Sequence, residues 1–262
     1  MQCIRPIWLE SAKRFVFCKK CIACKVARTR EWSVRMLHEM SSHEVSVFAT
    51  LTYSEDNIPS NGSISKSELQ RFFKRLRKRG CSLKYYASGE YGEQNGRPHY
   101  HAIIFGLSLK DRLVIEDAWR LGIVHLGTVT YDSCRYVAQY IDKVYYGDMI
   151  KQIYGDREQP FQLFSKGLGK NFILKNGDYL REKKGCTVRG VEVGVPRYYK
   201  NKLELEMDRV ESVHDTAYFQ NRISLSEKTR NVWLEEWKKE IAKNYQREKN
   251  IYGRKNLREK KL

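Results

Sequence analysis

At its centre the chain reads Gly96-Arg97-Pro98-His99-Tyr100-His101-Ala102-Ile103-Ile104-Phe105-Gly106, and this stretch predicts the fold around it. The apolar segment after the histidines is typical of a β-strand, in which alternate side chains lie on the same face. His99 and His101 therefore point the same way. We expect this strand to lie at the centre of a sheet.

A second strand is expected just upstream, over residues 83–88, and it leads into Glu90. The turn signal at residues 94–96 predicts a hairpin that brings Glu90 beside His99 and His101. Two imidazoles and one carboxylate would bind a metal ion and leave coordination positions open for substrate. The alternative is that the two histidines are solvated or hydrogen-bonded locally.

The composition favours a polyanionic partner. The chain has 262 residues and a net charge of +18, with a pI near 9.6, so nucleic acid is the first candidate partner. Hydrophobic residues make up 41% of the chain, which is enough for a core. The apolar runs are shorter than the ~20 residues of a membrane-spanning helix, and no secretion signal is expected at the N-terminus. We predict no membrane partner and a cytoplasmic location.

Three of the seven cysteines are clustered as Cys18, Cys21 and Cys24. They could bind a structural Zn²⁺ with a fourth ligand such as Cys3 or His38. The spacing is similar to that of bacterial iron–sulfur proteins, but Arg28 occupies the position of their fourth cysteine. Reduced cysteines without a metal are the alternative to zinc.

The predicted fold class is α/β (α+β), with a central antiparallel sheet of about five strands and flanking helices. Strands are expected over residues 45–53 and 123–130, and helices over 25–40, 68–79 and 110–120. Ser65 and Glu68 predict the start of the second of these helices. Cations on its polar face are candidates for contact with DNA phosphates, and the candidates are Arg71, Lys74, Arg75 and Lys78.

Residues 132–143 are expected to form a helix capped by Asp132 or Ser133. Tyr136, Tyr140 and Lys143 then lie on one face of it. A packing stripe is the alternative. Beside a metal ion, however, a phenol can attack a phosphodiester and form a covalent phosphotyrosine, with Lys143 assisting the reaction.

Four regions are expected along the chain. They are a basic N-terminal segment with the cysteines (1–44), a catalytic core (45–146), a loop-rich extension (147–224) and a basic C-terminal helix and tail (225–262). Near the end of the third region, Pro196-Arg197-Tyr198-Tyr199-Lys200 mixes aromatic and cationic residues as single-strand binders do. Arg97 and Arg197 are therefore also candidate DNA contacts.

In order along the chain, residues 48–53, Glu90 with His99-Tyr100-His101, and Tyr136-Val137-Ala138-Gln139-Tyr140 resemble the three motifs of HUH rolling-circle replication initiators. With the clustered cysteines and the Pro-Arg-Tyr-Tyr segment, the chain resembles more closely the replication initiators of gokushoviruses, small single-stranded DNA phages of the microvirus group. The resemblance covers most of residues 18–200.

The resemblance implies an HUH endonuclease-like fold and a nickase. The enzyme would cut one strand of the double-stranded replicative form at the viral origin, stay attached to the 5′ end, and rejoin the ends into single-stranded circles. His99, His101 and Glu90 would bind Mg²⁺ or Mn²⁺, and Tyr136 and Tyr140 would be the nucleophiles. Related microvirus proteins have lysine where this chain has Gln139, which leaves Lys143 as the candidate lysine.

The implied partners are origin DNA, in double- and single-stranded form, and the host helicase and polymerase, in the cytoplasm of the host bacterium. The chain has no nucleotide-binding phosphate loop, so a host helicase is expected to separate the strands. Two alternatives remain. One is an HUH transposase or relaxase with the same chemistry, and the other is a basic nucleic-acid-binding protein without catalytic activity.

Overall fold

The computed structural model describes residues 3–4, 6–9, 11, 14–92, 95–140, 149–205, 239 and 242–254. The chain divides into two compact units. One is Thr29–Glu206, and the other consists of Met1–Arg28 and Met207–Leu262. The first unit contains the central sheet and is described first.

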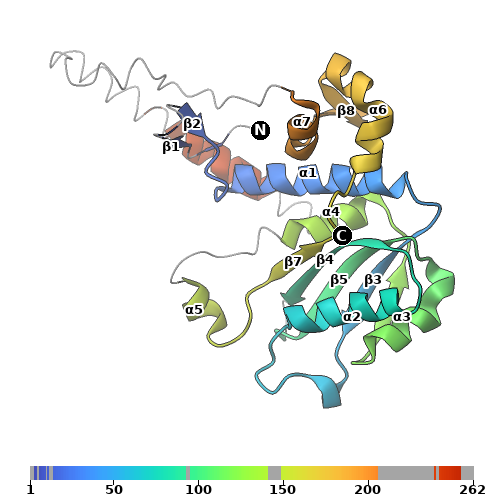
Figure 1. Ribbon diagram of the computed structural model, residues 1–262. Helices are drawn as coiled ribbons and strands as arrows, with labels where there is room; N and C mark the ends of the chain where they lie inside the picture. The colour runs from blue at the N-terminus through green and yellow to red at the C-terminus, as the bar shows by residue number, and fades with distance from the viewer. Residues whose placement is uncertain are drawn as a thin grey trace, which may run out of the picture. The chain divides into compact units, whose positions relative to one another are not determined.

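The predicted α/β (α+β) fold with a five-stranded antiparallel sheet is confirmed (Figure 1). The strand order is β6-β3-β5-β4-β7. The bounds are β3 Ser46–Thr52, β4 Lys84–Tyr91, β5 Pro98–Phe105, β6 Val124–Gly127 and β7 Phe161–Phe164. The strand with the two histidines, β5, is therefore central, as its nearly continuous apolar sequence predicts.

Helices cover both faces of the sheet. Their bounds are α1 Ile22–Met40, α2 Lys66–Lys78, α3 Arg112–Trp119, α4 Tyr131–Gln139, α5 Met149–Tyr154, α6 Lys170–Lys183 and α7 Arg197–Leu203. Short 3₁₀ helices span Glu55–Asn57 and Leu109–Asp111. Figure 1 shows α2 and α3 on one side of the sheet and α4 on the other.

The face under α2 and α3 is the larger apolar core. The predicted stripe of α2 is fully buried there, and it consists of Leu69, Phe72, Phe73 and Leu76. The side chain of Ser65 caps this helix by accepting a hydrogen bond from the backbone N–H of Glu68, as predicted. On the other face, Trp32 and Met36 of α1 pack with Val137 and Ala138 of α4 against Ile103 and Phe105.

The region expected to be a loop-rich extension contains regular structure in its described part. It includes α5, α6, α7, the edge strand β7, and a hairpin of β8 Gly185–Val188 and β9 Val191–Gly194. The sheet thus continues beyond residue 146, because β7 pairs with β4. The four-residue strand β7 has no alternation that a sequence pattern could detect, and the hydrogen bonds to β4 are what define it.

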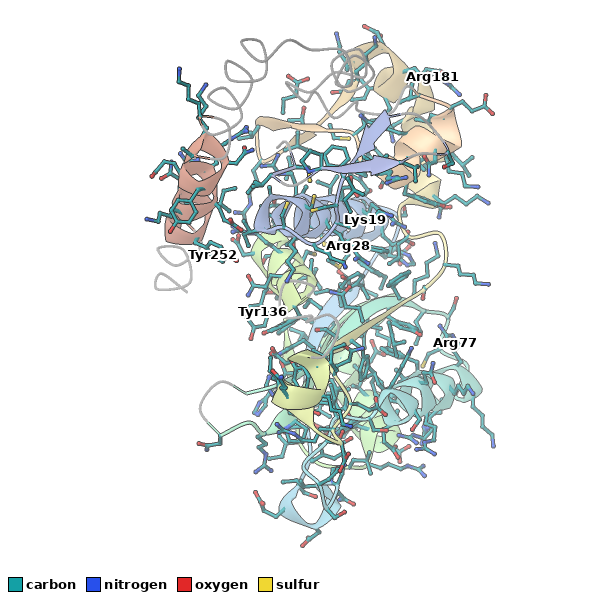
Figure 2. All side chains as sticks on the ribbon, turned by 90° about the vertical axis from the view of Figure 1, so that its left-hand side faces the viewer. Lys19, Arg28, Arg77, Tyr136, Arg181 and Tyr252 are labelled. Carbon is teal, nitrogen blue, oxygen red and sulfur yellow. The ribbon has the colours of Figure 1, made fainter. Side chains whose placement is uncertain are left out.

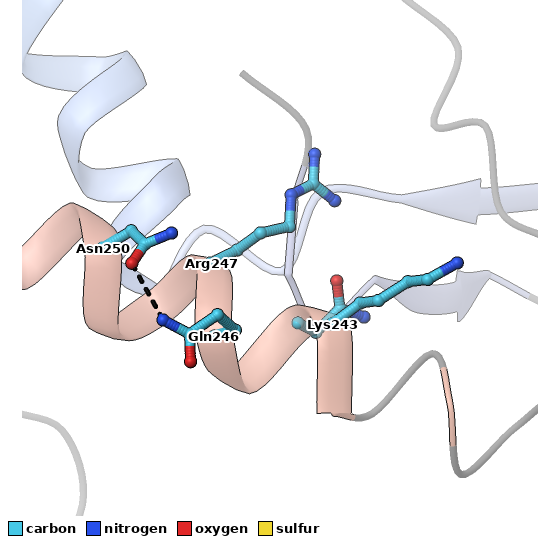
Figure 3. Close-up of a pocket in the computed structure, with 5 residues that line it drawn as sticks. Lys243, Gln246, Arg247 and Asn250 are labelled. Atoms are coloured by element: carbon cyan, nitrogen blue, oxygen red, sulfur yellow. Dashed lines mark hydrogen bonds between the residues drawn. The ribbon is translucent and has the colours of Figure 1, made fainter.

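The second unit contains the hairpin of β1 Ile7–Leu9 and β2 Arg14–Val16, and the start of α1. Residues 242–254 are helical, which agrees with the predicted C-terminal helix over the part that is described. Figure 3 shows a pocket on this helix, lined by Lys243, Asn244, Gln246, Arg247 and Asn250. None of the described helices in either unit is long and apolar enough to cross a membrane.

Gly122 holds the start of β6 against β3, and this gives a test of the fold. A Cβ at Gly122 would lie 2.3 Å from the carbonyl oxygen of Thr52 and from the backbone nitrogen of Ser54. Backbone atoms cannot move aside without breaking the hydrogen bonds between Thr52 and Ile123. Gly122→Ala is therefore expected to lower the free energy of unfolding by about 2–4 kcal/mol, measured by urea denaturation.

Gly127→Ala is the matched control. It lies at the other end of β6, and its added Cβ would meet only the ring of Phe48, at 3.7 Å. That is ordinary van der Waals contact, so a change within about 1 kcal/mol is expected. Equal destabilisation by the two substitutions would contradict this account of the β3–β6 junction.

Candidate metal and tyrosine site

The hairpin of β4 and β5 brings together the three predicted metal ligands. Glu90 lies directly opposite His99 in the antiparallel register, and His101 follows on the same face. Oε1 of Glu90 is 2.9 Å from Nε2 of His99 and 3.1 Å from Nε2 of His101. The three side chains offer ligand atoms that all lie within 4.8 Å of one another.

Hydrogen bonds on the far side of each ring orient the two imidazoles. Nδ1 of His99 lies 3.0 Å from the carbonyl oxygen of Arg97, which can only accept, so Nδ1 carries the proton. Nδ1 of His101 lies 3.0 Å from Oγ1 of Thr50. In metal sites this kind of bond fixes the tautomer and directs the other ring nitrogen at the ion.

Glu90 is held as an anion in a buried place. The residue is only 3% exposed, and burial alone would raise its pKa. Hydrogen bonds from His101, His99 and Tyr140 outweigh burial and lower the pKa of Glu90 to about 2. Nitrogen lone pairs facing a carboxylate oxygen repel it unless a proton or a cation lies between them. Two imidazoles and a buried carboxylate therefore fit a divalent metal ion.

Helix α4 faces this cluster and carries both predicted nucleophiles. The ring of Tyr140 is stacked on that of His101, with centroids 5.5 Å apart and planes 6° from parallel. The ring of Tyr136 meets His101 edge-on, with centroids 5.0 Å apart. Glu90 accepts a hydrogen bond from the phenol of Tyr140. The one helix thus brings two phenols to the three candidate ligands.

The two tyrosines differ in their surroundings. Tyr140 is 3% exposed, and burial together with the negative charge of Glu90 raises the pKa of its phenol. Tyr136 is half-buried, and Figure 2 marks its position on α4. A raised pKa means that a phenol at this position needs help to lose its proton before it can attack phosphorus.

Several contacts hold α4 in place. Its N-cap is Thr130, whose side chain accepts a hydrogen bond from the backbone N–H of Ser133. The prediction of Asp132 or Ser133 as the cap was therefore wrong by two or three residues, because the chain is still extended at Thr130. At the other end, the carbonyl oxygen of Ala138 accepts hydrogen bonds from Thr29 and Gln162, each at 3.5 Å.

Sequence reasoning missed Thr50, Ser88 and Gln162. Thr50 and Ser88 flank His101 on β3 and β4, and Ser88 is fully buried. Gln162 lies on β7, opposite Ser88. The alternation of β3 could have indicated Thr50 once its antiparallel pairing with the histidine strand was assumed. No local signal points to Gln162, because β7 itself is not evident from the sequence.

Thr50 is a positioning residue that can be tested. Thr50→Val keeps the shape but removes the oxygen that contacts Nδ1 of His101, so we expect about 10- to 100-fold weaker Mn²⁺ binding. Thr50→Ser keeps the hydroxyl and should bind Mn²⁺ as the unsubstituted chain does. The measurement is a Mn²⁺ titration followed by electron paramagnetic resonance. Equal affinity in the valine and serine variants would contradict this role.

The basic face of α2 is not at the site. Because α2 covers the opposite face of the sheet, Arg71, Lys74, Arg75 and Lys78 lie away from the histidines, as does Arg77, which is marked in Figure 2. Arg75 donates hydrogen bonds to the carbonyl oxygens of Ala118 and Trp119, and so it joins α2 to α3. Its structural role could not be distinguished from DNA contact in the sequence.

The remaining candidates lie in several places. Arg97 precedes His99, and its guanidinium donates to Glu55 at 2.5 Å and to the carbonyl oxygen of Tyr53 at 2.6 Å. Arg197 is exposed at the start of α7. Lys143 lies outside the described residues. Cys18, Cys21 and Cys24 lie in the other unit, where they cluster with Cys3.

His38, which was one of the two predicted fourth ligands for zinc, is engaged elsewhere. Its Nδ1 lies 3.0 Å from the hydroxyl of Tyr199, and its ring is stacked on Phe172 with centroids 3.6 Å apart. Burial lowers the pKa of His38 to about 4. The clustered cysteines therefore have Cys3, and not His38, as their neighbour.

Residues 46–145 match the family of the replication-associated protein ORF2, a range that includes all three candidate metal ligands and both tyrosines. Replication-associated protein VP4 of Bdellovibrio phage phiMH2K is 30% identical over 250 residues, covering 77% of this chain and 76% of that protein. Replication-associated protein ORF2 of Spiroplasma virus 4 is 30% identical, covering 72% of this chain and 68% of that protein.

Replication-associated protein ORF4 of Chlamydia phage 1 is 28% identical, covering 80% of this chain and 59% of that protein. No solved structure matches the chain. Two of these relatives match over more than two thirds of both chains, so the similarity includes both sides of the site. The chain belongs to the family of gokushovirus-like phage replication-associated proteins.

Proposed function

We propose that this replication-associated protein is an initiator endonuclease that nicks one strand at the viral origin through a tyrosine nucleophile. The observation that supports the proposal most is the position of Tyr136 and Tyr140, whose rings lie against His101, one of three convergent candidate metal ligands. A purely structural packing stripe would not need two buried polar ligands and a buried carboxylate beneath it.

The proposed reaction exchanges one phosphodiester for another. The phenolic oxygen of one tyrosine bonds to phosphorus and loses its proton, and the bond from phosphorus to the 3′ oxygen breaks. The 3′ oxygen takes up a proton, and the 5′ phosphate stays on the tyrosine. In rejoining, a 3′-hydroxyl attacks the phosphotyrosine and the phenol leaves, so no nucleotide cofactor is consumed.

His99, His101 and Glu90 would bind Mg²⁺ or Mn²⁺. Such an ion, when bound, polarises a phosphodiester oxygen and stabilises the negative charge of the transition state. Imidazole ligands favour Mn²⁺ over Mg²⁺. The protein's own part is to hold the phenols at the scissile phosphate, with Glu90 accepting a hydrogen bond from Tyr140.

Two tyrosines one turn apart would let the enzyme make a new cut while it still holds the first 5′ end, and so release circular single-stranded genomes. Lys143 is proposed to assist deprotonation and to stabilise charge. The proposed partners are origin DNA in double- and single-stranded form, and the host helicase and polymerase, in the host cytoplasm. The net charge of +18 supports DNA as the partner.

A denaturing gel tests the proposal. The full chain is incubated with Mn²⁺ and a labelled oligonucleotide spanning the origin, beside an oligonucleotide of scrambled sequence. A protein–DNA band that survives denaturation and needs both Mn²⁺ and the origin sequence is expected. Specific binding without such a band would favour a non-catalytic nucleic-acid-binding protein.

A further inference from the structure

Four cysteines form a compact cluster in the unit made of Met1–Arg28 and Met207–Leu262. They are Cys3, Cys18, Cys21 and Cys24, and their sulfur atoms all lie within 4.8 Å of one another. Cys3, Cys21 and Cys24 are each less than 9% exposed, and Cys18 is half-buried. All four are free thiols. This cluster has no part in the reaction proposed above.

The distances between the sulfurs match one tetrahedral metal ion. Zinc–sulfur bonds of about 2.3 Å place the corners of a tetrahedron about 3.8 Å apart. Sγ of Cys3 lies 3.9 Å from that of Cys21, and Sγ of Cys18 lies 4.0 Å from that of Cys24. A disulfide would need a separation of about 2 Å. The space is also too small for a cluster of several iron atoms.

Backbone donors point at two of the sulfurs. The N–H of Cys18 donates to the sulfur of Cys3, and the N–H of Cys21 donates to the sulfur of Cys18, each at 3.3 Å. Such hydrogen bonds stabilise thiolate, which is the form that binds a metal. Four thiolates this close would repel one another strongly unless a cation lay among them.

The apolar core around the cysteines is small. Apart from the cysteines, its buried members are Ile4, Ile22 and Ala23, and its half-buried members include Phe17, Val26 and Ile251 of the helix shown in Figure 3. Few large side chains are buried, so hydrophobic burial alone gives this described part little stability. Small domains of this kind are commonly stabilised by a structural metal.

We propose that Cys3, Cys18, Cys21 and Cys24 bind one structural Zn²⁺. Four sulfur ligands arranged as a tetrahedron favour zinc and leave no position open for substrate, which is typical of a structural site. The ion would join Cys3 to the loop before α1 and so close the segment that contains the β1–β2 hairpin onto the first turn of the helix.

Metal analysis of the full chain tests this inference. After purification and dialysis against dilute chelator to remove weakly bound ions, about one zinc per chain is expected. Cys21→Ser and Cys24→Ser should each lower the zinc content at least about tenfold. Cys81→Ser is the matched control, because Cys81 lies in the other unit and should leave the zinc content unchanged. Replacement by Co²⁺ should give intense thiolate-to-cobalt absorption.

The test is independent of the proposed nickase. His101→Ala should keep its zinc even if it loses all activity, and a chain with one zinc but no nicking would leave the zinc site standing. Should the serine variants fail to fold, titration of the unsubstituted chain with a mercurial reagent should release one zinc as four thiols react. Purified chain with no zinc, with iron in its place, or with two disulfides among these cysteines would overturn the inference.

Discussion

Replacing both Tyr136 and Tyr140 with phenylalanine is expected to abolish covalent attachment to origin DNA, a loss of at least about 1000-fold. Each single substitution should leave a detectable adduct, because the rings of both tyrosines lie within 5.5 Å of the His101 ring, measured between centroids. The readout is the denaturing gel with Mn²⁺ described above. The single variants should nick but fail to complete repeated cycles, since the second cut needs the other phenol.

Tyr131→Phe is the matched control for this experiment. Tyr131 is the first residue of the same helix, α4, but it packs with Tyr198 and Tyr199 and not with the histidines. Its substitution should leave the adduct unchanged. Full adduct formation by the double variant, with folding verified by circular dichroism, would show that neither phenol is the nucleophile.

Replacing His101 with alanine is expected to weaken Mn²⁺ binding at least about 100-fold and to reduce nicking by about 1000-fold. His101 is central to the site, because it contacts Glu90 and Thr50 and its ring lies beside both tyrosines. Glu90→Gln should have a similar effect, because it keeps the shape of the side chain but removes the buried charge. Mn²⁺ affinity and nicking rate are measured on the same preparations.

His43→Gln provides the control. His43 contacts Glu39 at 2.8 Å and lies near the ring of Phe105, at the end of β5 away from His99. Glutamine can keep the hydrogen bond to Glu39, so metal binding and nicking should not change. Unchanged activity in both His101→Ala and Glu90→Gln would exclude these residues as ligands of a catalytic ion.

The sequence was sufficient to predict the hairpin that brings Glu90 beside the histidines. The reason is that strand alternation and a two-strand turn are local features, and together they determine which side chains share a face. The same holds for Tyr136 and Tyr140, whose spacing places them on one side of a helix. That this helix lies over the histidine face depends on packing between Val137, Ala138 and Ile103, which no local pattern contains.

Residues that act through tertiary contacts could not be predicted. Thr50 and Gln162 reach the site from β3 and β7, and the pairing of β7 follows only from the assembled sheet. The basic face of α2 looked suited to DNA, yet the apolar stripe of the same helix holds it on the far side of the sheet. Cys3 and His38 were equally plausible neighbours of the clustered cysteines until their positions were known.

Mapping the attachment site tests the central claim most directly. The covalent complex formed by the unsubstituted chain is digested with trypsin and nuclease. Trypsin cleaves after Arg135 and Lys143, so both tyrosines lie in one peptide of residues 136–143. Mass spectrometry should find the nucleotide on that peptide, at Tyr136 or Tyr140. Attachment to any other residue, or nicked origin DNA without an attached peptide, would contradict the tyrosine mechanism.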